Sequence, residues 1–475
     1  MTPAQRMQQR LASLQTHLKQ ENPVLVAVVD RYKKLDAVAH KLGLLKPGES
    51  YATQISWWPL ISVLGTFSAG KSSFINSYLG MKLQDTGNQA VDDRFTVISY
   101  SSDEASRTLP GIALDGDPRF PFYQISEEIE QVTQGEGSKI DNYLQMKVVP
   151  SESLKGKILI DSPGFDADEQ RKSTLKLTDH IIDLSDLVLV LFDARHPEPG
   201  AMQDTLEHLV KGAQRRNDSS KFLFILNQID TSAKEDNLES IVASWHKALV
   251  QCGLSTGRFY VMFNKDLAVP VEDEGVWSRY LAKRDADYTA VTQRMEEINV
   301  ERVYRIIGNL ESLSNQIEQQ AVPQIKLART RWRKRVLTLD ALAMGSVTAG
   351  FGALAWSTGW LSEWVANPMG LLNDWFSLAL IAAFVLVLVF IHFTIRRWSA
   401  KSIAKSLSTE AVYGDLSHAF IKSTRTLSSV FRSNPVGWSK RASGKLSSIR
   451  NDVDQFVQKL NDNFSSPSGK NDKSA

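Results

Sequence analysis

The sequence contains a single cysteine, Cys252, among its 475 residues. One cysteine cannot form a disulfide framework or a cysteine-rich zinc site within one chain, and it fits a reducing, cytoplasmic environment. The eight histidines show no metal-ligand spacing such as H-E-x-x-H. The first residues have no apolar core after their charges, so we expect no secretory signal. These shortages argue against a secreted disulfide-bonded protein and against a zinc enzyme.

A strong charge of one sign is also missing. The chain has 55 Lys and Arg against 53 Asp and Glu, a formal net charge of +2. Such a balance provides no general attraction to nucleic acid, and we expect no nucleic-acid partner. The basic residues are nevertheless unevenly distributed, because many of them flank two apolar stretches late in the chain. Their placement therefore carries more information than their number.

A glycine-rich loop follows the apolar run of residues 60–64. Residues 65–72 read G-T-F-S-A-G-K-S and fit the phosphate-binding pattern G-x-x-x-x-G-K-[ST]. The run before the loop predicts a buried strand, and residues 72–79 predict a helix, which is the context that this pattern requires. Backbone N–H groups of such a loop and the positive end of the helix bind phosphate oxygens. The expected nucleotide contacts here are Gly65, Phe67, Ser68, Ala69, Gly70, Lys71, Ser72 and Ser73.

Two side chains of this loop have specific expected roles. Lys71 is expected to reach the β- and γ-phosphates, and the Ser72 hydroxyl is expected to ligate Mg²⁺. A second predicted strand ends in D-S-P-G at residues 161–164. At that position Asp161 can help to hold the Mg²⁺, and the Gly164 N–H can contact the γ-phosphate. The sequence therefore predicts binding of a nucleoside triphosphate with magnesium.

A third motif bears on the identity of the base. Residues 222–230 predict another strand and end in N-Q-I-D. The Asp230 carboxylate can accept hydrogen bonds from both N1–H and the exocyclic amine of guanine, whereas adenine offers no such pair of donors. Asn227 is expected to tie this loop to the phosphate-binding loop, and Gln228 is a further expected nucleotide contact. The motif favours GTP, with ATP as the alternative.

Residues 51–267 resemble the GTPase domain of dynamin-related proteins, most closely the EH-domain ATPases and bacterial dynamin-like proteins. The resemblance covers a little under half of the chain, and its motifs lie at residues 65–75, 86–95, 161–165 and 227–230. It implies an α/β P-loop GTPase domain, a mostly parallel sheet with helices on both faces. The near-continuous apolar run at residues 187–194 also favours such a sheet. The resemblance further implies dimerisation across the nucleotide face and turnover stimulated by self-assembly on membranes.

The first switch departs from the family pattern. The chain has Val91-Asp92-Asp93 where the family has Thr-Thr-Asp, and the second threonine normally covers Mg²⁺ and orients the attacking water. Asp92 can replace that hydroxyl as a metal ligand, although its charge would lie beside the triphosphate. We expect slow GTP hydrolysis, and a regulatory nucleotide-binding switch with negligible hydrolysis is the alternative. The expected catalytic residues are Ser68, Lys71, Ser72, Asp92 and Gly164.

Two apolar stretches predict a membrane hairpin at residues 339–397. Residues 376–395 are long enough to span a bilayer, and residues 341–361 are uncharged and rich in small residues that suit close helix packing. Basic residues flank both outer ends, whereas the connection at 362–374 has none. The positive-inside rule then places both flanks and the GTPase domain in the cytoplasm. A hairpin confined to one leaflet, or one buried in a soluble domain, is the alternative.

The remaining segments predict helices. Their expected extents are an N-terminal helical segment at 1–50, a GTPase domain at 51–270, a helical stalk or bundle at 271–338, cytoplasmic helices at 398–464 and a disordered tail at 465–475. Apolar stripes at helical spacing favour one antiparallel bundle over separate membrane-lying helices. Pro323 is expected to break the helix that contains it.

These observations together predict an integral membrane protein that couples nucleotide-dependent self-assembly to membrane remodelling, tethering or fusion. The expected partners are a lipid bilayer and further copies of the chain. The basic segment at 326–335 suggests anionic lipids as well. The charge pattern suits a bacterial inner membrane.

Overall fold

The computed structural model describes residues 2–65, 68–85, 94–117, 119–120, 141–163, 171–195, 221–251, 258–269, 271–366, 375–409, 411–426 and 428–464. The chain divides into two compact units. The sheet unit comprises Gln8–Val26 and Thr53–Ile306, and the helical unit comprises Met1–Met7, Ala27–Ala52 and Ile307–Ala475. Each unit is thus assembled from segments that are distant in the sequence.

The sheet unit is built on one 8-stranded sheet with the order β3-β4-β2-β5-β1-β6-β7-β8. The strands are β1 (Leu60–Gly65), β2 (Phe95–Tyr100), β3 (Arg107–Pro110), β4 (Leu144–Val149), β5 (Ile158–Asp161), β6 (Leu187–Asp193), β7 (Phe222–Asn227) and β8 (Arg258–Val261). Strands β5, β1, β6, β7 and β8 pair in parallel, whereas β2 pairs with β5 and β3 with β4 in the antiparallel sense. The predicted mostly parallel α/β sheet is confirmed.

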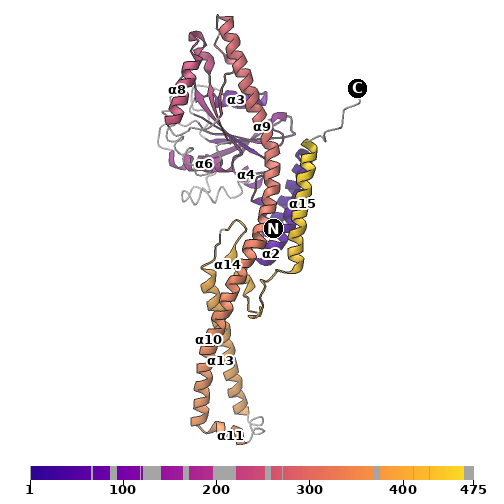
Figure 1. Ribbon diagram of the computed structural model, residues 1–475, viewed down its shortest axis with the longest axis vertical. Coiled ribbons are helices and arrows are strands. Elements are labelled where there is room, and N and C mark those ends of the chain that lie inside the picture. Colours follow the sequence, from indigo (N-terminus) through magenta and orange to yellow (C-terminus); the bar gives the residue numbers. More distant parts are fainter. Residues whose placement is uncertain are drawn as a thin grey trace, which may run out of the picture. The chain divides into compact units, whose positions relative to one another are not determined.

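Helices cover both faces of this sheet, as Figure 1 shows for α3, α6, α8 and α9. Their bounds, with those of the N-terminal helices, are α1 (Pro3–Glu21), α2 (Pro23–Leu42), α3 (Lys71–Leu79), α4 (Ile112–Gly116), α6 (Arg171–Leu184), α8 (Leu238–Gln251) and α9 (Glu274–Gln316). Phe74 on α3 and Met295 on α9 pack on one face, and Ile182 on α6 and Trp245 on α8 pack on the other. Burial of both faces explains why β1, β6 and β7 are apolar at nearly every position.

The helical unit contains α10 (Val322–Ser357), α11 (Trp360–Ala366), α13 (Trp375–Ala404), α14 (Leu416–Ser423) and α15 (Lys440–Phe464). Helices α10 and α13 lie side by side (Figure 1), and the Trp332 indole N–H donates to the carbonyl oxygen of Arg396 at 3.2 Å. The N-terminal part of the unit joins the C-terminal helices, because Arg31 pairs with Asp452 at 2.6 Å. Residues from both ends of the chain therefore form one helical assembly.

The expected helix break at Pro323 is wrong. Pro323 lies in the first turn of α10, and the preceding segment η9 (Ile317–Ala321) is a π-helix that continues from α9. A proline lacks the N–H that the α-helical ladder requires and collides with the carbonyl four residues earlier. The wider π-helical turn shifts the hydrogen-bond register before the proline, so the chain stays helical.

Two helical segments are long and apolar enough to cross a membrane, by length and composition. Their most apolar windows lie in Glu274–Ser357, with a mean hydropathy of 1.4, and in Trp375–Ala404, with a mean hydropathy of 2.8. Only 6% and 0% of the residues in these windows are buried, so neither segment has the packing of a core helix. This exposure argues against the alternative of a hairpin buried in a soluble domain.

Candidate nucleotide-binding site

The phosphate-binding loop connects β1 to α3. Gly70 precedes the first residue of α3 with a φ of 83°, and Ser68 has a φ of 58°, so the loop turns through the left-handed region at two positions. Gly65 ends β1, where a Cβ atom would lie 2.7 Å from the carbonyl oxygen of Leu191 on β6. A side chain at Gly65 would therefore force the loop away from the sheet. Phe67 lies outside the described residues.

Lys71 occupies the first position of α3. Its ammonium group donates to the carbonyl oxygen of Gly65 at 3.0 Å, so the side chain folds back over the loop. Burial lowers the pKa of Lys71, and the charge of Asp161 acts in the opposite direction. Ser72 and Ser73 follow in the first turn, and both are partly buried. This arrangement directs a cation and the positive end of α3 toward one loop, which is the electrostatic requirement for binding phosphate.

The N-Q-I-D loop is joined directly to the phosphate-binding loop. The Asn227 side-chain amide donates to the carbonyl oxygen of Ala69 at 2.9 Å, which is the contact expected of it. The Gln228 amide donates to the carbonyl oxygen of Ser68 at 2.5 Å. Asn227 lies so close to Gly70 that a Cβ atom at Gly70 would overlap the Asn227 amide nitrogen. The two loops therefore form one structure, although their sequences are far apart.

Asp161 ends β5 beside β1, in register with Val63. The side chain is buried, and one of its carboxylate oxygens accepts from the Gln84 amide at 2.6 Å. Gln84 in turn accepts from the Lys147 ammonium at 2.5 Å. Neither Gln84 nor Lys147 belongs to a motif, so sequence reasoning missed both. Their polar chain fixes the position of the Asp161 carboxylate at the end of its strand.

Asp230 is buried in the turn that follows β7. Its carboxylate accepts from the backbone N–H of Val269 at 3.0 Å, which joins the N-Q-I-D loop to the segment after β8. Burial raises the pKa of Asp230, and the Val269 hydrogen bond and the charge of Arg195 oppose that rise. Arg195 is held at the end of β6 by Asp193, through Nη2 to Oδ2 at 2.6 Å. Sequence reasoning also missed this pair.

Three of the expected catalytic and binding residues, Phe67, Asp92 and Gly164, lie outside the described residues. Thr96, another hydroxyl near the first switch, is described and has a different role. It is buried within β2, and its hydroxyl accepts from the Gln145 amide at 2.8 Å. Thr96 is thus part of the sheet.

The donor set fits Mg²⁺. Asp161 supplies a carboxylate and Ser72 a hydroxyl, and hard oxygen ligands of this kind suit magnesium. Among the described residues no group of three or more His, Cys, Asp or Glu converges as a metal cluster. A magnesium ion bound with a nucleotide needs only one or two protein oxygens, because phosphate oxygens and water complete its shell.

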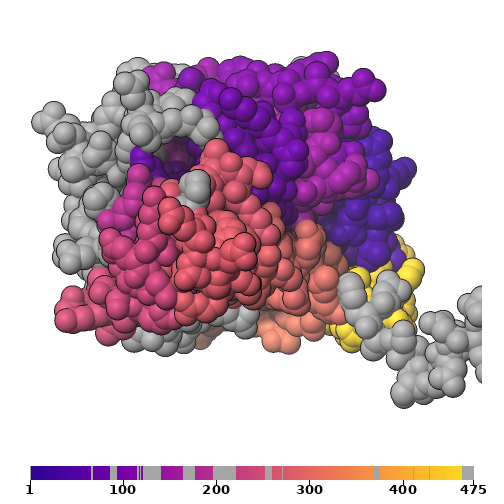
Figure 2. Space-filling model, turned by 90° about the horizontal axis from the view of Figure 1, so that it is seen from above, coloured from indigo at the N-terminus to yellow at the C-terminus, as the bar shows by residue number. Residues whose placement is uncertain are grey.

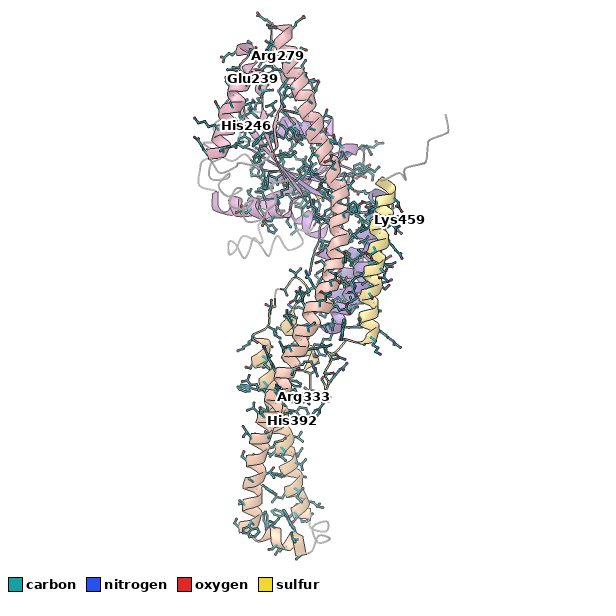
Figure 3. All side chains as sticks on the ribbon, viewed as in Figure 1. Glu239, His246, Arg279, Arg333, His392 and Lys459 are labelled. Atoms are coloured by element: carbon teal, nitrogen blue, oxygen red, sulfur yellow. The ribbon has the colours of Figure 1, made fainter. Side chains whose placement is uncertain are left out.

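A separate cavity of about 400 Å³ lies between α8, β8 and the start of α9. Glu239 and His246 on α8 and Arg279 on α9 are among its lining residues (Figure 3). The pink and salmon surfaces of α8 and α9 adjoin each other in Figure 2. Arg279 pairs with Asp236 at 2.6 Å, and Lys283 pairs with Asp287 at 2.8 Å. Because these cations are already paired, the cavity lacks the free positive charge that a triphosphate requires.

Comparison with known proteins finds similarity within the sheet unit. The model of the Dynamin family matches residues 61–229. Human EH domain-containing protein 1 is 24% identical over 182 residues, which are 36% of this chain and 31% of the relative. Mouse EH domain-containing protein 2 is 26% identical over 179 residues, which are 36% of this chain and 30% of the relative. The chain therefore matches about a third of the length of these curated relatives.

A comparison with solved structures gives alignments at low sequence identity. One of these structures is an oligomerised bacterial dynamin pair, which is said to provide a mechanism for the long-range sensing and tethering of membranes. Its sequence is 14% identical to this chain. The alignment covers 96% of this chain and 79% of that one, with a TM-score of 0.34.

Proposed function

We propose that this chain is a membrane-anchored, dynamin-like GTPase, and the match of residues 61–229 to the model of the Dynamin family supports this proposal. In this proposal it binds GTP with Mg²⁺, hydrolyses it slowly, and couples nucleotide-dependent dimerisation to membrane remodelling, tethering or fusion. The helical hairpin of α10 and α13 is the proposed anchor, with both termini and the sheet unit in the cytoplasm.

The observation that carries the nucleotide site is the pair of hydrogen bonds from Asn227 and Gln228 to the phosphate-binding loop. These bonds hold Asp230, the proposed guanine reader, at a fixed separation from the loop that binds the phosphates. A nucleotide needs both contacts at once, and a rigid connection lowers the entropy lost on binding. Either motif by itself would be much weaker support.

The proposed roles of the individual residues follow from this arrangement. Backbone N–H groups of the loop and Lys71 stabilise negative charge on the phosphates, including the charge that develops on the transferred group. Ser72 and Asp161 are the proposed magnesium ligands, and bound Mg²⁺ would neutralise charge on the β- and γ-phosphate oxygens. Ser68, Asp92 and Gly164 are proposed to orient the attacking water and to contact the γ-phosphate.

The membrane anchor is supported by exposed apolar surface and by charge. The apolar windows in α10 and α13 are almost entirely unburied, and large apolar side chains such as Leu386 and Phe390 face outward. Exposing such an apolar surface to water is unfavourable, whereas contact with lipid chains is not. Basic residues flank the outer end of each apolar stretch, for example Arg335 and Arg397, which is the pattern that the positive-inside rule expects on a cytoplasmic side.

Replacing Lys71 tests the nucleotide site. We expect Lys71→Ala to abolish GTP binding, since the loop would lose the cation nearest the phosphates, and to leave the protein in the membrane fraction after alkaline carbonate extraction. The matched control is Lys82→Ala, which removes an exposed lysine shortly after α3. Binding would be measured by titration with a fluorescent GTP analogue. Normal binding by Lys71→Ala would overturn the phosphate site, and release of the unaltered protein by carbonate would overturn the anchor.

A further inference from the structure

Two buried arginines in the helical unit have no carboxylate partner among the described residues. Arg329 on α10 is 2% exposed and Arg396 on α13 is 8% exposed. Both guanidinium groups lie over the Trp332 ring, at 5.9 and 5.4 Å from its centroid. Asp340, the carboxylate whose charge acts on Arg396, is bonded to His392 at 2.7 Å. Among the described residues, neither guanidinium group therefore forms an ion pair with a carboxylate, although the Asp340 charge acts on Arg396.

The arginines instead hold a loop against the helix pair. Arg329 donates to Ser423 and to the carbonyl oxygens of Ser429 and Arg432, the last at 2.8 Å. Arg396 donates to the carbonyl oxygens of Arg425 and Ser428. These bonds fix the segment from Thr424 to Arg432, of which residue 427 is not described, beside α10 and α13. We call it the 424–432 loop.

Carbonyl dipoles only partly compensate these charges. The Nε atoms of Arg329 and Arg396 are buried, and neither has a hydrogen-bond partner in the part of the chain that the structure describes. Burial lowers the pKa of Arg329, and the positive charges of Arg432 and Arg396 lower it further. A buried charge without an opposite charge is costly, and nearby anions outside the protein would reduce that cost. The cluster thus favours a negatively charged neighbour.

The outer surface of the cluster is basic and aromatic. Arg333 lies over the Phe431 ring at 5.4 Å, and Arg335 lies over the Trp398 ring at 4.8 Å. Phe431 is 67% exposed and Trp398 is 57% exposed. No Asp or Glu occurs in residues 322–339, 393–409 or 416–451, the segments that supply this surface. Exposed aromatic rings beside arginines are typical of the interface between a membrane and water.

We propose that α10, α13 and the 424–432 loop form a binding surface for the headgroups of anionic phospholipids. The inference rests on the proposed membrane hairpin, because α10 and α13 continue from this surface into their exposed apolar stretches. With the hairpin inserted, Arg333, Arg335 and Arg432 lie at headgroup level, and Phe431 and Trp398 enter the interface. Anionic headgroups then supply the negative charge that the described protein residues do not.

The test measures lipid selectivity of the full-length protein in proteoliposomes. Electron spin resonance of spin-labelled phosphatidylglycerol and phosphatidylcholine gives the relative association of each lipid with the protein. We expect phosphatidylglycerol to be preferred, and the preference to decrease as salt is raised. Arg432→Gln should lower the ratio by up to about fivefold, and Phe431→Ser should also lower it. Both side chains are exposed, and neither residue flanks an apolar stretch closely enough to set its orientation.

The matched control is Lys459→Gln, which removes one exposed positive charge from α15, away from Arg333 in Figure 3. An equal loss of lipid selectivity in this control would overturn the proposed surface. The surface would also be overturned if the unaltered protein resists carbonate extraction but shows no preference for phosphatidylglycerol. Inorganic phosphate that abolishes selectivity more strongly than chloride at the same ionic strength would identify a free-phosphate site instead. Carbonate release of the unaltered chain would overturn the hairpin together with this inference.

Discussion

At the scale of single residues, Asp230 gives the candidate site a pH dependence. Burial raises its pKa, so its carboxylate takes up a proton at a higher pH than an ordinary aspartate. Only the ionised form offers two acceptors to the two guanine donors. Affinity for GTP should therefore be complete above the raised pKa and should fall as the pH is lowered through it. Titration of a fluorescent GTP analogue across pH would show this decline beginning above the usual range of aspartate.

The control for that prediction is Asp230→Asn. An amide cannot ionise in this range, so the variant should bind GTP weakly and with little change in affinity over the same pH interval. The folded protein would also gain from protonation of Asp230, because a raised pKa means that the ionised carboxylate destabilises the nucleotide-free fold. Guanine binding would offset that destabilisation. Identical pH profiles for the two proteins would contradict the assignment of Asp230.

Residues that belong to motifs could be found from the sequence, and residues defined by tertiary contacts could not. The contact of Asn227 with the phosphate-binding loop was predictable, because the order of motifs indicates which strand ends lie together. Gln84 and Lys147 were not predictable, because they act on Asp161 from other parts of the chain. The same holds for Arg195, whose charge acts on Asp230. Polar side chains without a motif acquire a role only through the fold.

At the scale of elements, Asp186 connects α9 to the start of β1 within the sheet unit. The side chain is 1% exposed, accepts from the backbone N–H of Leu60 at 3.0 Å, and pairs with Arg302 at 3.0 Å and Arg305 at 2.8 Å. Arg302 also donates to the carbonyl oxygen of Ser56 at 2.8 Å. One carboxylate thus joins a helix and a central strand that are distant in sequence.

Removing that carboxylate should destabilise the sheet unit. Asp186→Ala removes the carboxylate that Arg302 and Arg305 share and the acceptor of the Leu60 N–H, which should lower the free energy of unfolding by about 3 kcal/mol. Amide hydrogen exchange of the full-length protein in detergent would report the loss as faster exchange in β1. The control is Asp285→Asn, whose pair with Lys265 is exposed and should contribute less than about 1 kcal/mol. Equal effects in the two variants would contradict a special role for Asp186.

Helix boundaries illustrate what local sequence can and cannot predict. The sequence predicted helices in residues 271–338, and the structure has α9 and the first part of α10 there. Pro323 suggested a break, but the π-helical segment η9 accommodates it. A proline determines which backbone hydrogen bond is lost. The surrounding packing determines whether the chain then turns away or continues as a helix with a shifted hydrogen-bond register. In η9 both Ile317 and Ala321 are buried, so packing favours continuation.

At the scale of the whole molecule, the segment boundaries expected from the sequence remain predictions. Each of the two compact units combines segments from different parts of the chain. Arg31 near the N-terminus pairs with Asp452 near the C-terminus, and the Tyr51 hydroxyl donates to the carbonyl oxygen of Tyr413 at 2.8 Å. Apolar stripes predicted a helical bundle, but a stripe does not specify which helix covers it. The pairing of the two ends of the chain therefore required the structure.

The last prediction concerns turnover and assembly of the whole chain. If it works as a membrane-coupled GTPase, a guanine nucleotide with a transition-state mimic should produce dimers of the purified protein, and GTP hydrolysis should increase on liposomes. ATP should produce neither effect if Asp230 reads guanine. Size-exclusion chromatography and single-turnover phosphate release measure the two properties separately.

Replacing Asp92 distinguishes a GTP-hydrolysing enzyme from a nucleotide-binding switch with negligible hydrolysis. If the Asp92 carboxylate replaces the missing switch hydroxyl as a metal ligand, Asp92→Ala should abolish liposome-stimulated phosphate release while GTP binding is retained. Asp93→Ala is the matched control, because it removes a neighbouring carboxylate with the same change in charge. Absence of phosphate release by the unaltered chain, with liposomes present and dimers formed, would favour the switch. In that case nucleotide binding, rather than hydrolysis, would have to drive any change at the membrane. A bound nucleotide can do so only if it binds one conformation of the protein more tightly than another.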